Sequence, residues 1–274
     1  MKRLFFAIAV AATAFAVNAN AQISVGAGYA NETVVSKDVS VLGENYAGYS
    51  WKKSRLQLDG FYLEAAYNWD LAEVGPGTIA LQPGIRYSCL TNFTEKARTN
   101  VRYSAEGAQS LSAKGYSKKR LSDHFIDVPV HVKYAYDFVP GIIRAYAFAG
   151  PVVSLGLAAK EVNASKSNVI YDDNAQVELD IERYNGYTGR YYLKTFNEET
   201  QKYDVDKGKD DAFKSYTMFD LKLALGVGVT LSEKVDVKLG YNIGLLNRSF
   251  IKNHNDVKYF VHSNVFYFGV AYNF

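Results

Sequence analysis

Cysteine, long apolar runs and excess charge of either sign are all scarce in this sequence. Its 274 residues include a single cysteine, Cys89, so no internal disulfide can form. Beyond the N-terminus, no stretch approaches the roughly 18 unbroken apolar residues of a membrane-spanning helix, which excludes a helical membrane protein. The formal net charge of +3 is too weak to indicate a nucleic-acid partner. Stability must therefore come from a buried core or from a closed barrel held in a membrane.

The N-terminus has the three parts of a secretory signal peptide. Lys2 and Arg3 form a basic region, an apolar and uncharged segment follows, and Ala19-Asn20-Ala21 fits an A-x-A cleavage site. The apolar segment has about 14 residues, which is too short for a spanning anchor. We predict that this signal peptide, residues 1–21, is removed, and that residues 22–274 form one domain.

Aromatic residues are abundant and lie in alternating patterns. The sequence contains 22 Tyr and 16 Phe. In residues 219–231, every second residue is Phe, Leu or Val, and those between are small or polar. Such a period of two is typical of β-strands. The pattern recurs in Gln22–Asn31, Phe61–Trp69, Thr78–Ser88, Ile126–Tyr136, Val235–Leu245 and Phe266–Phe274. It also recurs in Ile143–Leu157, where a change of phase near Gly150-Pro151 predicts a bulge.

The connections between these eight predicted strands alternate in length. Three are short turns, at 70–77, 137–142 and 232–234. Four are long and polar, at approximately 32–60, 89–125, 158–218 and 246–263. Short turns on one side and long loops on the other are typical of outer-membrane barrels. An even strand count places both termini of the mature chain on the short-turn side, which is periplasmic in such barrels.

Two all-β folds are compatible with this pattern of strands. A soluble lipocalin-like barrel would point its apolar face inward and a solvated face outward. Here the second face is rich in glycine, which weakens a water-exposed strand but suits a crowded, narrow lumen. Aromatic residues also lie near the strand ends, as a membrane girdle requires. We therefore predict an all-β fold, an eight-stranded antiparallel up-and-down transmembrane β-barrel with long extracellular loops, in a Gram-negative bacterial outer membrane.

Three segments carry a family resemblance. They are Phe125–Tyr134 (FIDVPVHVKY), Tyr146–Pro151 (YAFAGP) and Tyr267–Phe274 (YFGVAYNF). Together they resemble the outer-membrane β-barrel domain family of the PorT type, common in Bacteroidota. The resemblance implies a small outer-membrane barrel and, because some members serve the type IX secretion system, possible partners in a protein-secretion complex. The terminal Phe with alternating aromatics is similar to the signal read by the barrel-assembly machinery during insertion.

The inward-facing charges are the first candidate site. Four acids and four bases share the second face of the strands, so the lumen is electroneutral: Glu64, Asp127, Asp220 and Asp236, with Arg86, Lys133, Lys222 and Lys238. An eight-stranded barrel is just wide enough for side chains to fill, and buried charges must be paired there. We therefore expect a salt-bridged plug. The alternative is a proton or ion path.

Catalytic and metal-binding patterns are weak. The four histidines, His124, His131, His254 and His262, read as polar rim or lumen residues, and no G-x-S-x-G or H-E-x-x-H sequence is present. Residues 204–211 contain alternating acids but fail the EF-hand pattern. We predict no enzyme activity, cofactor or metal, although an enzyme whose groups come from separate rim loops stays open.

The long loops are the remaining candidates. The segment 89–125 carries seven bases and three acids, a net charge of +4. Lys118, Lys119 and Arg120 are its densest group, and we predict that they contact lipopolysaccharide phosphates or are simply solvated. The segment 158–218 is too long for a bare connector and predicts a hairpin around residues 184–187. Its clustered tyrosines suit either a contact surface or packing within the hairpin.

The sequence thus favours a non-catalytic outer-membrane barrel with a closed lumen and loops for surface binding or envelope structure. Outer-membrane lipid and lipopolysaccharide are its expected surroundings. The alternatives are an accessory component of a protein-secretion complex and, more weakly, an enzyme whose site lies on the rim of the barrel. Fold alone does not decide among these functions.

Overall fold

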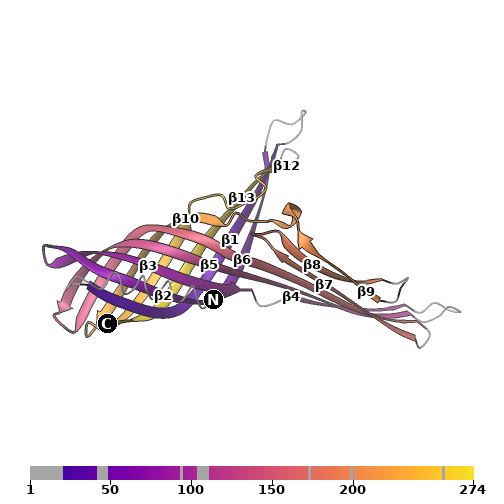
Figure 1. The fold of residues 1–274 in the computed structure, drawn as a ribbon, viewed down its shortest axis with the longest axis horizontal. Coiled ribbons are helices and arrows are strands. Elements are labelled where there is room, and N and C mark those ends of the chain that lie inside the picture. Colours follow the sequence, from indigo (N-terminus) through magenta and orange to yellow (C-terminus); the bar gives the residue numbers. More distant parts are fainter. Residues whose placement is uncertain are drawn as a thin grey trace. The chain divides into compact units, whose positions relative to one another are not determined.

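The computed structural model shows eight strands that close into a ring. It describes residues 21–41, 49–92, 95–103, 111–171, 174–197, 200, 202–254 and 257–274. The antiparallel neighbours run β1-β2-β3-β5-β6-β10-β11-β13, and β13 pairs back onto β1 (Figure 1). These strands are β1 (Ala21–Val41), β2 (Tyr49–Val74), β3 (Gly77–Thr91), β5 (Leu111–Val139), β6 (Ile143–Tyr171), β10 (Phe219–Leu231), β11 (Val235–Gly244) and β13 (Val257–Asn273).

The chain divides into two compact units. The barrel unit holds the residues up to Leu90, with His124–Gly156 and Met218–Phe274, and the second unit holds Thr91–Asp123 and Leu157–Thr217. Short strands complete the structure: β4 (Glu95–Tyr103), β7 (Asn174–Asn185), β8 (Arg190–Asn197), β9 (Lys202–Lys209) and β12 (Asn253–His254). A single turn of 3-10 helix, η1 (Asp211–Phe213), follows β9. The helical residues of the described chain form no segment long and apolar enough to cross a membrane.

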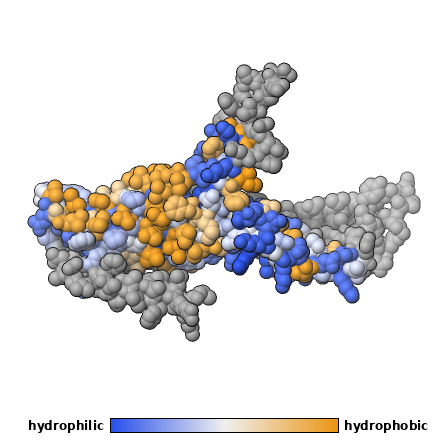
Figure 2. Space-filling view, turned by 45° about the horizontal axis from the view of Figure 1, so that its top comes forward, coloured by the Kyte–Doolittle hydropathy of each residue, from blue (hydrophilic) through white to orange (hydrophobic). Residues whose placement is uncertain are grey.

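The apolar face of the barrel strands points outward. On β13, Phe268 is 46% exposed and its neighbour Tyr267 is 0% exposed, and the alternation continues to the end of the strand. Figure 2 shows hydrophobic side chains gathered over the barrel wall. A soluble barrel would bury this face, because apolar surface is driven out of water. The predicted eight-stranded antiparallel barrel is therefore confirmed, and the lipocalin-like alternative is wrong.

The predicted bulge near Gly150-Pro151 is also wrong. Burial alternates without a break along the barrel part of β6, with Phe148 and Val152 inward and Ala149 and Pro151 outward. The sequence pattern changes phase here because Tyr146, Phe148 and Val152 are apolar although they face the lumen. Apolar side chains that fill an interior erase the contrast between the two faces.

The four segments predicted as long loops are in large part strand. β1 continues to Val41, β2 already begins at Tyr49, and β5 and β6 have 29 residues each. Hydrophobic alternation ends where the apolar surroundings end, whereas the hydrogen-bonded ladder depends only on the backbone. The pattern in the sequence therefore reported the length of the apolar wall and not the length of the strands.

The second unit contains the predicted hairpin. β7 pairs with β8 around a turn at 186–189, with Tyr184 opposite Tyr191, and β8 pairs with β9. Tyr184 stacks on Phe213 with ring centroids 5.0 Å apart and donates a 2.6 Å hydrogen bond to Glu182. Burial and this bond to a carboxylate raise the pKa of Tyr184 to about 12.

Tyr187 is buried in the same unit and donates to both carboxylate oxygens of Asp123, at 2.8 and 2.9 Å. Of the clustered tyrosines of segment 158–218, Tyr184, Tyr187, Tyr191 and Tyr203 make ring contacts within the second unit, although Tyr203 is 39% exposed. Packing within the unit thus accounts for most of the cluster.

The turn between β10 and β11 is strained. Ser232 and Glu233 have φ angles of 50° and 59°, and Lys234 N–H donates to the Leu231 carbonyl at 3.0 Å. Two central residues with positive φ are typical of a type I′ turn, which prefers Asn-Gly. A left-handed conformation costs an ordinary L-residue roughly 1–2 kcal/mol.

Changing this turn to Ser232→Asn with Glu233→Gly should therefore stabilise the barrel by about 1–2 kcal/mol. Urea unfolding in detergent micelles, followed by tryptophan fluorescence, would measure the gain. The matched control is Pro140→Ala in the turn between β5 and β6, where Gly141 already supplies the positive φ. A neutral or destabilising result for the Asn-Gly turn would show that the turn carries no strain.

Candidate functional site: the lumen of the barrel

The middle of the lumen holds three charges in contact. Glu64 on β2 accepts from Arg86 on β3, with 2.5 Å between the guanidinium nitrogen and the carboxylate oxygen. The ammonium of Lys238 on β11 bonds the other oxygen of the same carboxylate. All three side chains are buried. One carboxylate thus bridges two cations from different walls of the barrel, and this crosslinks β2, β3 and β11.

Two tyrosine rings complete this layer. The Arg86 guanidinium lies 3.8 Å from the ring centre of Tyr267 and 4.9 Å from that of Tyr62. The two rings meet edge to face, with centroids 5.8 Å apart. Cation–π contacts of this kind gain strength when the cation is desolvated. We call Tyr62, Glu64, Arg86, Lys238 and Tyr267 the central layer.

Glycines make room for the inward aromatic rings. Four of these rings lie beside a glycine on the adjacent strand, in the pairs Gly28–Tyr62, Gly226–Phe148, Gly228–Tyr146 and Gly240–Tyr267. A Cβ atom added at any of these glycines would collide with the ring of its partner. The glycine-rich face predicted to suit a crowded lumen therefore has a specific cause, since a flat ring covers each of these glycines.

Beyond the central layer, away from the short turns, Lys222 pairs with Asp127 at 3.4 Å. Lys222 also lies over the Phe125 ring, 4.2 Å from its centre. Asp220 is buried beside Lys222 on β10, and its carboxylate oxygens have no hydrogen-bond partner among the described residues. Lys222 and Asp127 are therefore in direct contact, whereas Asp220 forms no ion pair among the described residues.

Towards the short turns, which define the turn end of the barrel, the last two predicted residues stay apart. Lys133 on β5 lies 3.9 Å from the centre of the Tyr146 ring. Asp236 on β11 accepts a hydrogen bond from the Thr230 hydroxyl at 2.5 Å. Both are buried, and no ion pair joins them in the described part of the chain. All eight predicted lumen residues thus face inward, and five of them form ion pairs: Glu64, Arg86, Lys238, Asp127 and Lys222.

A further buried pair was missed by the sequence analysis. Arg248 bonds Glu32 at 3.1 Å, and Ser263 also donates to that carboxylate. Both charged residues lie in segments predicted as loops. For Glu32 a signal existed, because it continues the even-numbered inward phase of Gly28 and Ala30 on β1. Arg248 follows the end of β11, where no alternation indicates its direction.

The histidines do not meet one another in the described chain. His131 is buried in the lumen against the Phe148 ring, with centroids 4.7 Å apart. His124 bonds the Tyr87 hydroxyl through Nδ1 at 2.8 Å. His262 is half-buried, and the side chain of His254 lies outside the described set.

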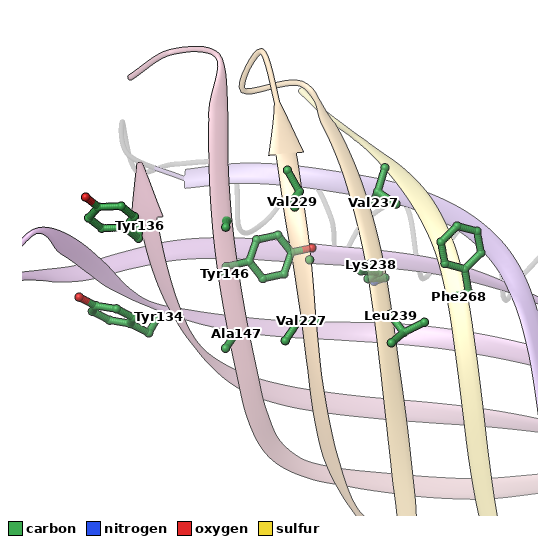
Figure 3. Close-up of a pocket in the computed structure, with 12 residues that line it drawn as sticks. Tyr134, Tyr136, Tyr146, Ala147, Val227, Val229, Val237, Lys238, Leu239 and Phe268 are labelled. Carbon is green, nitrogen blue, oxygen red and sulfur yellow. The ribbon is translucent and has the colours of Figure 1, made fainter. Parts of the chain in front are cut away.

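The outer wall carries a shallow apolar hollow of about 550 Å³ near the turn end (Figure 3). Its lining comes from β5, β6, β10, β11 and β13, with Tyr134, Ala147, Val227 and Leu239 among the outward residues. Tyr146 and Lys238 contribute too, although their side chains are buried. The hollow thus belongs to the apolar wall of the barrel.

The predicted lipopolysaccharide contacts lie in the second unit. Lys119 pairs with Glu161 at 2.7 Å. Arg120 is exposed, and its Nε–H donates to the Thr91 hydroxyl at 3.3 Å. The side chain of Lys118 lies outside the described set. Lys119 and Arg120 are therefore both within reach of an anion, but Lys119 already has a carboxylate partner.

A closed ring of antiparallel strands with an apolar outer wall and a charged lumen defines an integral membrane β-barrel. The model of the family described as "Outer membrane protein beta-barrel domain" matches residues 17–249. The chain belongs to this family, whose members reside in the bacterial outer membrane. No curated protein matches its sequence.

Several solved structures are similar to the chain. Ail of Yersinia pestis is 11% identical with a TM-score of 0.26, over 93% of this chain and 99% of Ail. Neisserial surface protein A is 14% identical with a TM-score of 0.28, over 92% and 97%. The outer membrane protease OmpT of Escherichia coli is 11% identical with a TM-score of 0.34, over 92% and 97%. These scores are low, so the assignment rests on the family match and on the eight-stranded ring.

Proposed function

We propose that the protein is a non-catalytic outer-membrane barrel whose lumen is a structural plug and whose second unit binds at the cell surface. The central layer carries the first half of this proposal. Arg86, Lys238 and Glu64 span the lumen from three strands, and two tyrosine rings cover the guanidinium. Moving a solute past them would separate buried ion pairs and leave uncompensated buried charges, which costs roughly 3–5 kcal/mol.

The second half of the proposal concerns orientation and surface charge. We infer that the turn end faces the periplasm and that the long connections are exposed at the cell surface, as in this class of barrel. Lys118, Lys119 and Arg120 would then lie where lipopolysaccharide phosphates are found. An epitope inserted between Asn197 and Lys202 should be detected by antibody on intact cells. Detection only after permeabilisation would contradict this orientation.

Charge reversal of Lys118, Lys119 and Arg120 to Glu should lower lipopolysaccharide retention on the purified protein at least fivefold. The physical reason is that Lys and Arg attract phosphate and three glutamates repel it. Retention is measured as bound lipopolysaccharide per barrel after detergent extraction.

Glu161→Gln is the matched control for this experiment. It frees Lys119 from its 2.7 Å partner and removes a negative charge, so it should raise retention. Equal retention in all three proteins would contradict a phosphate site and leave these residues as an ordinary solvated surface.

A protein partner is the second candidate function, as in a PorT-like secretion complex. The observation that favours it is strand β9, which ends the strand order and has all eight residues exposed. Tyr203 and Val205 are 39% and 53% exposed on it. A free strand edge is a template for pairing with another chain.

Gentle detergent purification from native membranes tests this candidate. A stoichiometric partner set that disappears with Val205→Pro, which removes an edge N–H, supports a secretion-complex role. Glu161→Gln, which lies off this edge, serves as the control. A barrel that purifies alone supports the autonomous surface protein.

A further inference from the structure

A cavity of about 610 Å³ opens at the turn end of the barrel. Its lining residues lie on the turn side of Lys238 and Glu64, and neither of these two belongs to the lining. Its lining is mostly polar and includes Gln82, Lys133, Thr230 and Asp236. A salt-bridged layer in the middle of the lumen does not by itself require such a cavity.

Lys133 is the exception among the buried cations of the described chain. Arg86, Lys238, Lys222 and Arg248 each have a carboxylate partner. Lys133 is just as buried, at 5% exposure, but among the described residues it forms no ion pair and instead lies over the Tyr146 ring. A buried ammonium without an anion is costly, because its desolvation is not compensated. This one unpaired cation lines the cavity.

Asp236 is its counterpart on the opposite wall. It lines the same cavity from β11, is buried, and has a hydroxyl rather than a cation as its hydrogen-bond partner. Asp236 and Lys133 are both buried and both line the cavity, and no ion pair joins them among the described residues. A buried cation and a buried anion therefore face one space with a gap between them.

The rim of the cavity restricts which ligand fits. Asp137 is occupied by Arg144 at 3.5 Å, while Asp70 and Glu233 add negative charge. A free anion would meet these acids on entry, and a free cation would meet Lys133 inside. A molecule that carries a positive and a negative group close together can pair with both Lys133 and Asp236.

We propose that this cavity binds an α-amino acid zwitterion, with the ligand carboxylate on Lys133 and the ligand ammonium on Asp236. The Thr230 hydroxyl and the Gln82 amide supply further polar contacts. The remaining volume accepts a small side chain. This inference does not depend on what the second unit binds.

Equilibrium dialysis of the purified full-length barrel with radiolabelled L-alanine tests the site. L-alanine should bind, and acetate and methylammonium should each compete at least tenfold more weakly. Lys133→Met and Asp236→Asn should each weaken L-alanine binding at least tenfold. Glu161→Gln, in the second unit, should leave it unchanged. Heat-modifiable gel mobility confirms that each variant has folded.

Three results would overturn the proposal. The first is no L-alanine binding to a folded barrel at millimolar concentration. The second is equal binding by the variant that combines Lys133→Met with Asp236→Asn. The third is competition by acetate as strong as that by unlabelled L-alanine, because a simple anion site needs no Asp236.

Discussion

Glu64→Ala should destabilise the barrel by about 3–5 kcal/mol, the usual cost of removing one partner from a buried ion pair. The substitution leaves two like charges, Arg86 and Lys238, buried next to the space that Glu64 occupied. Urea unfolding in micelles, read by tryptophan fluorescence and by heat-modifiable mobility, measures the loss.

Two comparisons separate charge from packing. Glu64→Leu with Arg86→Met and Lys238→Met makes the layer apolar and should restore most of the stability, because apolar replacements of buried ion pairs are often neutral. Glu161→Gln breaks an ion pair of similar length, 2.7 Å, that is partly exposed, and should cost less than about 1 kcal/mol. Equal losses from Glu64→Ala and Glu161→Gln would show that the central layer is not a buried network.

Gly240→Val should cost about 3 kcal/mol, although valine favours strands more than glycine does. A Cβ atom at position 240 would collide with the Tyr267 ring, which lies directly opposite on β13. The ring would have to leave its place over Arg86. The same unfolding assay measures the effect.

If the clash with the Tyr267 ring is the cause, the destabilising effects of Gly240→Val and Tyr267→Ala should not add. In a Tyr267→Ala background the ring is absent, so adding Gly240→Val should cost less than about 1 kcal/mol. Gly84→Ala is the matched control on the same inward face, because its Cβ would meet Ala66 Cβ at 3.1 Å and backbone rather than a ring. If the two losses simply add, the clash between ring and side chain is not the reason that position 240 is glycine.

The barrel was predictable because its two faces have different surroundings. Side chains that face lipid are apolar and most that face the lumen are small or polar. In the strands from Phe219 to Phe274, the sequence therefore shows which way each side chain points. Where both faces are apolar, as at Tyr146 and Phe148, the signal fails and a false bulge results. Where polar and apolar residues are mixed on both faces, as in β1 beyond Glu32, the strand continues without a clear signal.

The inward direction of the lumen charges was predictable, and their pairing was not. The alternation of apolar and polar residues predicts that Glu64 and Lys238 point inward, but the two are 174 residues apart in the chain. Their contact depends on how the strands are staggered around the ring, which no local pattern records. For the same reason, nothing in the sequence indicates that Lys133 forms no ion pair among the described residues or that a cavity lies beside it.

Single-channel recording in planar bilayers tests the closed lumen most directly. The wild-type barrel should show no stable conductance, because the central layer fills the lumen. The variant that combines Arg86→Ala, Tyr62→Ala and Tyr267→Ala should show discrete openings, which proves that the protein inserts under the same conditions. Steady, reproducible openings of the wild-type barrel would contradict the plug.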